Sequence, residues 1–280
     1  MSREKGRGRR RVGRLVKMSL LSVVALIVLV HGIHALTLDR IVVYNEISFT
    51  SPNLPPEMDG YRIAFVTDIH AMDDFDRRLQ GVVEELNTRQ IDLLLVGGDI
   101  ALDSDDLGPA IGLLAQIVTT DGAFGVEGNH DHYQALFAAM EAQGITPLSN
   151  SGTYIREGFY LAGVEDLWNR NPNVAAAIAG AGPDSFVLLL SHNPDVSMQQ
   201  DTRGVDLILS GHTHGGQLNF FGRWSIGLDS GIISAYGTRF RSGWAQSQDG
   251  VPVYVCRGVG QYYPRVFARP EVTVITLLRG

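Results

Sequence analysis

The feature that most constrains the fold of this chain is a short apolar run that recurs five times and ends each time in polar residues. The runs are rich in Val, Ile, Leu and Phe and are too short for independent helices, which is typical of buried strands. They are RIAFV (62–66), IDLLLV (91–96), AFGV (123–126), FVLLL (186–190) and VDLIL (205–209). Helix-like segments lie at 77–90, 107–118 and 132–144. This alternation predicts α/β layers in which helices cover sheet.

The polar residues after these runs predict a binding site, because ligand sites in open α/β sheets gather at the carboxyl ends of strands. Six of the eight histidines belong to these segments, and the other two, His31 and His34, lie in the N-terminal apolar segment. A single histidine after a strand is usually a cap or a surface residue. Chance rarely sends nearly every histidine of the body to equivalent positions, so the strand ends are the expected functional site.

The residue types at these strand ends predict a metal centre without sulfur ligands. Cys256 is the only cysteine in the sequence, which excludes a multi-cysteine zinc site. Carboxylate, imidazole and amide oxygen suit divalent ions such as Mn²⁺, Fe²⁺ or Zn²⁺. The seven candidate ligands are Asp68, His70, Asp99, Asn129, His192, His212 and His214. This set is too large for one tetrahedral zinc and suits two ions about 3.5 Å apart that share a carboxylate.

The last block, SGHTHGGQ (210–217), contains two histidines one residue apart. Side chains at such a spacing point in opposite directions along a strand. His212 and His214 therefore bind one ion together only if the backbone turns between them, and bind two neighbouring ions if it does not. The glycines at 211, 215 and 216 permit such a turn.

In order along the chain, the blocks D-x-H, G-D, G-N-H-D, a lone His and G-H-x-H are similar to those of the calcineurin-like metallophosphoesterase superfamily. The extended G-H-T-H-G-G-Q, the S-H-N-P-D block and the late Y-V-C-R-G-V-G resemble its membrane-anchored bacterial branch, often called YkuE-like. The resemblance covers most of residues 40–278. It implies a two-sheet αββα sandwich and a metal-dependent phosphoric ester hydrolase.

The same resemblance implies a role for each matched residue. The implied ligands are Asp68, His70 and His214 for a first ion, Asn129, His192 and His212 for a second, and Asp99 as the bridge between them. His130 is the expected catalytic acid, which touches the phosphoryl oxygen or the leaving group rather than a metal. A hydroxide between two cations is a nucleophile at neutral pH, and an imidazolium protonates the departing alkoxide.

One position departs from the family pattern. Many relatives carry an Asp three residues after the bridging Asp, where it orients the catalytic histidine; here that position is Leu102, and Asp103 follows one step later. Either Asp103 or Asp131 orients His130, or His130 has no carboxylate partner. We place Asp131 with His130 in the catalytic set, because outer-shell carboxylates commonly orient imidazoles. The alternative for Asp131 is an N-cap of the helix that begins near His132.

The N-terminal segment 18–38 contains no Asp, Glu, Lys or Arg and reaches roughly 30 Å as a helix, which just spans a bilayer. Eight of the 23 cations lie in residues 1–17, against Arg40 alone just after the segment. This asymmetry predicts a single pass through the cytoplasmic (inner) membrane, with the N-terminus in the cytoplasm and the body outside. We favour an uncleaved signal anchor because no small-x-small cleavage site follows the apolar part. The alternatives are a cleaved signal peptide and a buried soluble helix.

These boundaries predict four regions. They are a basic cytoplasmic head (1–17), a transmembrane or signal-anchor helix (18–38), a strand and proline-rich linker (39–60) and a catalytic domain (61–280). The aromatic and arginine cluster FFGRW (220–224) of the last region lines a pocket, faces lipid or packs at a strand edge.

The charge of the body argues against a nucleic-acid partner, since residues 18–280 hold 15 Arg and 29 acids and non-specific nucleic-acid binding needs cations. The predicted function is hydrolysis of a phosphodiester, phosphomonoester or pyrophosphate with two divalent metal ions. By analogy with UDP-2,3-diacylglucosamine pyrophosphatases of lipid A synthesis, a lipid-linked or cell-envelope substrate is an attractive hypothesis. The alternative is a non-catalytic metal-binding or sensor domain. The pair Asn129-His130 argues against it, because a binding module needs no acid beside its metals.

Overall fold

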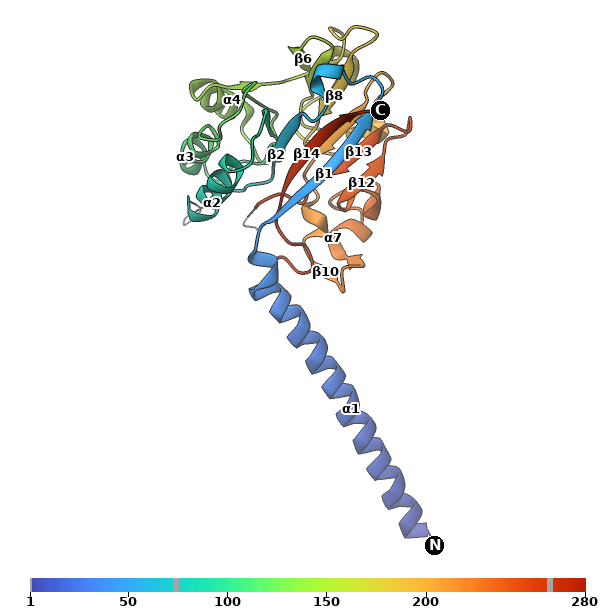
Figure 1. Ribbon diagram of the computed structural model, residues 1–280. Coiled ribbons are helices and arrows are strands. Elements are labelled where there is room, and N and C mark those ends of the chain that lie inside the picture. The colour runs from blue at the N-terminus through green and yellow to red at the C-terminus, as the bar shows by residue number, and fades with distance from the viewer. Residues whose placement is uncertain (1, 73–75, 261–263) are drawn as a thin grey trace.

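The computed structural model describes residues 2–72, 76–260 and 264–280, and consists of a long N-terminal helix attached to one end of a two-sheet domain (Figure 1). Helix α1 (Ser2–Leu36) contains most of the apolar segment and leads through the short helix η1 (Leu38–Arg40) into the domain. The stretch Val12–Arg40 is long and apolar enough to cross a membrane, and its apolar window is not buried inside the protein.

The first sheet has the strand order β1-β14-β2-β3-β4-β5. Its strands are β1 (Val43–Ser51), β14 (Glu271–Arg279), β2 (Arg62–Val66), β3 (Leu93–Val96), β4 (Ala123–Gly125) and β5 (Ile145–Pro147). Strand β14 runs parallel to β1 and antiparallel to β2, and β2 to β5 are parallel to one another. The helices that cover its outer face are α2 (Asp76–Asn87), α3 (Ser104–Leu114) and α4 (Tyr133–Ala142).

The second sheet has the strand order β12-β13-β9-β8-β7-β6. Its strands are β12 (Gly243–Gln246), β13 (Pro252–Val255), β9 (Leu207–Ser210), β8 (Phe186–Leu190), β7 (Phe159–Gly163) and β6 (Ser151–Arg156). The four inner strands are parallel, and the two edge strands are antiparallel to their neighbours. Its outer face is covered by the short helices α5 (Val174–Ala177), α6 (Val196–Gln199) and η4 (Gly237–Phe240).

The apolar core lies in three layers, which confirms the expected αββα sandwich. In β2, Ala64 and Val66 pack under the helices of the first sheet, whereas Ile63 and Phe65 pack between the two sheets. This two-residue alternation follows from strand geometry. Because both faces of each inner strand are covered, the sequence of such a strand reads as a continuous apolar run.

The remaining elements are small. They are η2 (Pro56–Met58), η3 (His214–Gly216), the hairpin strands β10 (Asn219–Phe220) and β11 (Trp224–Ser225), and α7 (Ile226–Asp229). In Figure 1, β10 and α7 lie at the end of the domain that α1 joins. The carboxyl end of β2 lies at this same end, since Phe65 pairs with Thr273 of β14 and the start of β14 pairs with Val43, the first residue of β1.

Candidate metal centre

The five predicted strand ends come together at the α1 end of the sandwich. Because β2, β3 and β4 are parallel in one sheet, and β8 and β9 in the other, their carboxyl ends form one edge of each sheet. The residues that follow them are Asp68 and His70 after β2, Asp99 after β3, Asn129, His130 and Asp131 after β4, His192 after β8, and His212 and His214 after β9. These residues are therefore neighbours although up to about 150 positions separate them in the chain.

Asp99 lies in the middle of the cluster. Its Oδ2 atom is 3.5 Å from Nε2 of His70 and 3.4 Å from Nε2 of His192. Nε2 of His214 is 3.4 Å from Oδ1 of Asp68 and 3.1 Å from Nε2 of His70. One ligand atom from each of Asp68, His70, Asp99 and His214 lies within 4.8 Å of the others. Two donors that bind the same ion at about 2.1 Å are roughly 3.0–3.4 Å apart, so these four side chains fit around one cation.

Three further predicted ligands, Asn129, His192 and His212, lie together on the other side of Asp99. Nε2 of His192 is 3.2 Å from Oδ1 of Asn129, and the rings of His192 and His212 meet edge to face at 5.2 Å. A backbone carbonyl accepts a hydrogen bond from each of these imidazoles: Gly97 O from Nδ1 of His192 at 2.8 Å, and Ile233 O from Nε2 of His212 at 3.0 Å. When the imidazole is neutral, such a bond fixes its tautomer and leaves the opposite ring nitrogen with a lone pair for a metal.

The backbone that carries these ligands is tightly constrained. A left-handed conformation costs a non-glycine residue about 1–2 kcal/mol. Five of the candidate ligands adopt it, with φ between 46° and 70°: Asp68, His70, Asp99, His212 and His214. The glycines beside them are required, because a Cβ atom at Gly128 would collide with the carboxylate of Asp99, and one at Gly211 with that of Asp68. Strain of this kind persists where the surrounding structure holds it, most often at functional sites.

The protonation states divide the cluster into two kinds of histidine. Burial lowers the pKa of His70 to about 4, that of His212 to about 3 and that of His214 well below its ordinary value. These imidazoles are neutral at physiological pH, as metal ligands must be. Burial has the same tendency at His192, but the carboxylate of Asp99 outweighs it and raises the pKa of His192 to about 10. A metal ion that binds His192 must therefore displace a proton from its imidazole.

Comparison with known proteins identifies the family to which the chain belongs. The family model for calcineurin-like phosphoesterases matches residues 61–216, the part of the chain that contains every strand end described above. The chain belongs to the calcineurin-like phosphoesterase family. It is therefore a metal-dependent phosphoester hydrolase, and the resemblance inferred from the sequence blocks is confirmed.

Three relatives show how far the similarity of this phosphoesterase extends. The metallophosphoesterase YkuE of Bacillus subtilis is 31% identical over 83% of this chain and 84% of its own length. The phosphodiesterase YaeI of Escherichia coli is 29% identical over 85% of this chain and 88% of its own. A transmembrane protein with a metallophosphoesterase domain from Danio rerio is 29% identical over 83% of this chain, which spans 56% of that protein.

His130 lies at the opening of the phosphoesterase site. It is exposed, its ring meets that of His70 edge to face at 5.2 Å, and its backbone N–H donates to Oδ1 of Asp99 at 2.8 Å. The carboxylate of Asp99 thus holds the backbone of His130 at the edge of the cluster.

Asp131 holds the loops rather than capping a helix. Its Oδ2 accepts the N–H groups of Asp99 at 2.7 Å and Gly128 at 2.8 Å, and its Oδ1 accepts that of Ile100 at 2.9 Å. The N-cap of α4 is His132, so the N-cap alternative for Asp131 is wrong. Asp103, the other carboxylate considered for His130, is exposed at the N-cap position of α3.

A cavity of about 230 Å³ opens over the cluster, and part of its lining was not anticipated from the sequence. Its walls are formed by Asp99, Asn129, His130, Trp168, His212, His214, Gln217 and Ile233. Trp168 meets the ring of His212 edge to face at 4.5 Å. Trp168 follows β7. The sequence of this strand, FYLAG (159–163), is a sixth short apolar run of the same kind as the five predicted strands.

Arg265 is a second residue that the sequence motifs did not assign. It is completely buried, and its Nη2 lies 3.0 Å from Nδ1 of His214 while Nη1 donates to the carbonyl of Arg257 at 2.9 Å. Its guanidinium therefore contacts the ring of His214 on the side that faces away from Asp68.

Proposed function

We propose that this phosphoesterase uses two divalent cations, bound on either side of Asp99, to hydrolyse a phosphoester. The observation that carries the proposal is the position of Asp99 Oδ2, which lies between a histidine from each group, His70 and His192. The proposed ligands are Asp68, His70 and His214 for one ion, Asn129, His192 and His212 for the other, and Asp99 for both. Oxygen and imidazole donors without thiolate suit Mn²⁺, Fe²⁺ or Zn²⁺. When bound, such ions supply a water that is nucleophilic near neutral pH and neutralise charge on phosphorus.

The residues of the chain itself bind and orient the substrate and move the proton. His130, exposed at the cavity, is placed to donate a proton to the oxygen that leaves phosphorus. Its backbone N–H bond to Asp99 keeps it beside the reacting group. We assign Asp131 as a positioning residue, because its carboxylate ties together the loops that carry Asp99 and Asn129.

We propose a phosphodiester as the first substrate class to test, since the relative YaeI is described as a phosphodiesterase. A lipid-linked or cell-envelope phosphoester is the finer proposal, supported by the apolar helix α1 and by the transmembrane relative. We further propose that residues 1–17 stay in the cytoplasm, that 18–38 cross the inner membrane and that the catalytic domain (61–280) lies outside. The excess of cations before the helix supports this orientation.

The proposal is tested by metal analysis and hydrolysis on the full chain in detergent. Wild-type protein is expected to hold about two ions per chain and to cleave bis(p-nitrophenyl) phosphate faster than p-nitrophenyl phosphate with Mn²⁺ added. Asp99→Asn should lose metal and reduce kcat by roughly 1,000-fold, because the shared carboxylate serves both ions.

The matched control is Asp184→Asn, the same chemical change at an exposed residue before the amino end of β8. It should leave metal content and kcat within about twofold of wild type. Two bound ions without hydrolysis of either ester, together with an Asp99→Asn variant that behaves like wild type, would contradict the proposed function.

A further inference from the structure

We propose that one face of the domain, beside α1, rests on the lipid bilayer and opens the metal cavity at the membrane surface. This hairpin face consists of apolar side chains from the β10–β11 hairpin, from α7 and from the turn after it, with exposed fractions from 39% to 71%. Its residues are Leu218, Phe220, Phe221, Trp224, Ile226 and Ile232. Soluble surfaces rarely gather so many large apolar side chains, and such a patch marks an interaction site.

The hairpin face contacts α1 within the apolar segment of the helix. This contact sets how deep the face lies in the membrane. The ring of His31 lies 4.9 Å from that of Phe220 and 4.7 Å from that of Phe221, and its Nε2 is 3.4 Å from the N–H of Phe221. His31 precedes the end of α1 at Leu36 by five residues, or about 7.5 Å along the helix axis. The segment 18–38 matches the roughly 30 Å hydrocarbon core and ends two residues after Leu36, so His31 lies about 10 Å inside the core. If 18–38 spans the membrane, both phenylalanines therefore reach below the headgroups into the acyl region.

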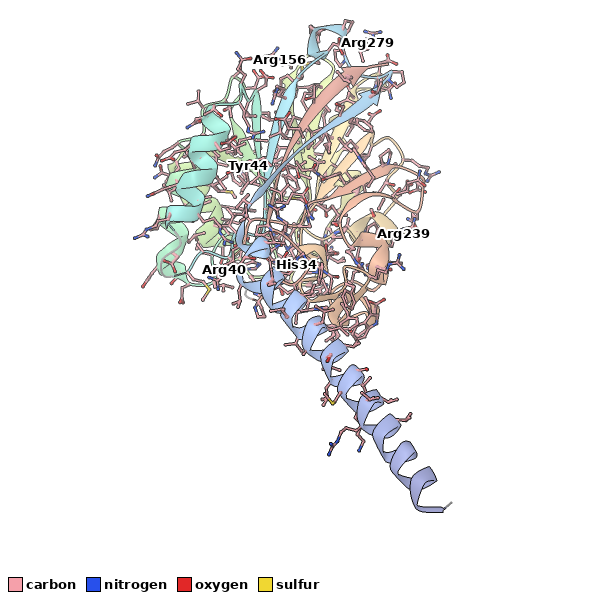
Figure 2. All side chains as sticks on the ribbon, turned by 60° about the horizontal axis from the view of Figure 1, so that its bottom comes forward. His34, Arg40, Tyr44, Arg156, Arg239 and Arg279 are labelled. Carbon is pink, nitrogen blue, oxygen red and sulfur yellow. The ribbon has the colours of Figure 1, made fainter. Side chains whose placement is uncertain are left out.

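The junction between α1 and the domain is packed, so the hairpin face keeps this position. The ring of His34 stacks on that of Phe267 at 3.7 Å. The buried carboxylate of Asp39 accepts the N–H groups of Phe267 at 2.8 Å and Ala268 at 3.2 Å. Figure 2 shows His34 where α1 meets the domain, with the labelled Arg156 and Arg279 at the opposite end. The domain is therefore packed against the end of α1 rather than joined to it by an unstructured linker.

The charge and the residue types of the hairpin face also fit a membrane surface. Residues 218–241 hold three Arg and one acid, in a body of 15 Arg and 29 acids. Arg223 is exposed within the hairpin and Arg40 just after α1, where both suit anionic headgroups. The single acid, Asp229, accepts the N–H of Ser225 at 2.6 Å. Trp is one of the residues that gather at membrane interfaces, and Phe and Leu are typical of apolar faces that enter them.

The hairpin face adjoins the metal cavity. Gln217 and Ile233 line that cavity, and their chain neighbours Leu218 and Ile232 belong to the face. A second, apolar cavity of about 170 Å³ lies against it, lined by His31, Leu218, Asn219, Phe220, Trp224, Ile226 and Val266. A phosphoester with a long alkyl chain thus reaches the metals with its phosphoryl group while its chain stays at the bilayer. This substrate class rests on the proposed function, whereas the membrane contact does not.

Tryptophan fluorescence tests the membrane contact without requiring activity. The full chain is inserted into vesicles of phosphatidylcholine and phosphatidylglycerol, with or without phosphatidylcholine brominated near the headgroup. Its three tryptophans are Trp168, Trp224 and Trp244. Trp224→Phe should reduce the bromine-dependent quenching at least about threefold, because Trp224 is the one placed at the interface. Trp244→Phe is the matched control: Trp244 is 47% exposed, against 53% for Trp224, but lies on β12 and packs on Phe49.

Insertion of α1 is verified by resistance to alkaline extraction. Quenching that is absent in inserted wild-type protein, or equal in wild type and Trp224→Phe, overturns the membrane contact. If absent quenching coincides with cross-linked dimers through the hairpin, the face binds a second copy of the chain and the proposal is wrong.

Hydrolysis tests the substrate class. Phe220→Ser combined with Phe221→Ser should reduce cleavage of hexadecyl p-nitrophenyl phosphate in these vesicles at least about fivefold and leave bis(p-nitrophenyl) phosphate within about twofold. Unchanged metal content excludes misfolding as the cause. Equal losses on both esters, or no loss on the hexadecyl ester, overturn the alkyl-chain substrate. If wild type cleaves neither ester, the proposed function fails, and the fluorescence result still decides the membrane contact.

Discussion

The two proposed groups of ligands on either side of Asp99 differ in charge and in exposure. The first group contains the fully buried carboxylate of Asp68 and two histidines whose pKa is lowered. The second contains the partly exposed amide of Asn129, His212 with a lowered pKa, and His192, whose pKa Asp99 raises. A group with its own carboxylate and neutral imidazoles is ready for a cation, whereas the second depends on Asp99 and must lose a proton. We therefore expect the first group to bind its ion more tightly.

The largest expected effect comes from Asp68→Asn. The carboxylate of Asp68 belongs to the first group and also accepts the backbone N–H of His212 at 2.9 Å, so its loss disturbs both groups. We expect bound metal to fall below about one ion per chain and kcat to fall roughly 1,000-fold. Metal analysis and diesterase kinetics measure both quantities. Retention of one tightly bound ion in this variant would contradict the order of affinities.

His192→Gln should break the second group alone. The first group has its own ligands, so we expect about one ion to remain per chain while kcat falls roughly 100-fold. Equilibrium dialysis against Mn²⁺ counts the ion. Loss of both ions would show that the two groups are not separable, and the comparison would fail.

Asp131→Asn should have a smaller effect, roughly tenfold on kcat with a matching loss of affinity for the second ion. The physical reason is that an amide oxygen accepts the N–H groups of Asp99 and Gly128 less strongly than a carboxylate does. The pH profile of kcat separates this role from a direct one. A shift of its alkaline limb in Asp131→Asn would indicate that Asp131 acts on His130 instead.

The smallest predicted signal is the proton released when each ion binds. At pH 8 His70, with its pKa lowered to about 4, and Asp68, whose pKa burial raises to about 6, are already deprotonated, whereas His192, with a pKa of about 10, is not. The second ion should therefore release about one proton more than the first, and its affinity should rise with pH between 8 and 10. Titration calorimetry in buffers of different ionisation enthalpy measures this difference. Equal proton release for the two ions would remove the electrostatic distinction between the groups.

The sequence predicted the sandwich and the ligand cluster because each depends on local patterns. Inner strands such as β3 and β8 are apolar on both faces, and their ends carry residues with recognisable chemistry. The sequence patterns did not predict Trp168 as a site residue, because its strand β7 is not among the five predicted strands, although FYLAG is an apolar run of the same kind. They did not predict Arg265 either, because its role depends on contact with His214, which lies 51 residues away in the sequence.

The orientation of the domain on α1 could not be predicted from the sequence at all. The aromatic run FFGRW (220–224) was compatible with a pocket, with lipid and with strand-edge packing. Only the contacts of Phe220 and Phe221 with His31, 190 residues away from Phe221 in the chain, place this run beside the apolar helix.

The bond between Asp39 and the backbone of Phe267 and Ala268 affects how a soluble fragment of this protein should be designed. A fragment that starts at residue 40 removes this carboxylate and leaves the two N–H groups without their acceptor. The same loop carries Arg265, which donates to the carbonyl of Ala268 at 3.4 Å and contacts the ring of His214. Cutting three residues earlier, after Leu36, removes the apolar helix but keeps Asp39. The choice between these two start sites thus decides whether the loop that contacts His214, a proposed metal ligand, keeps its support in a protein purified without its membrane.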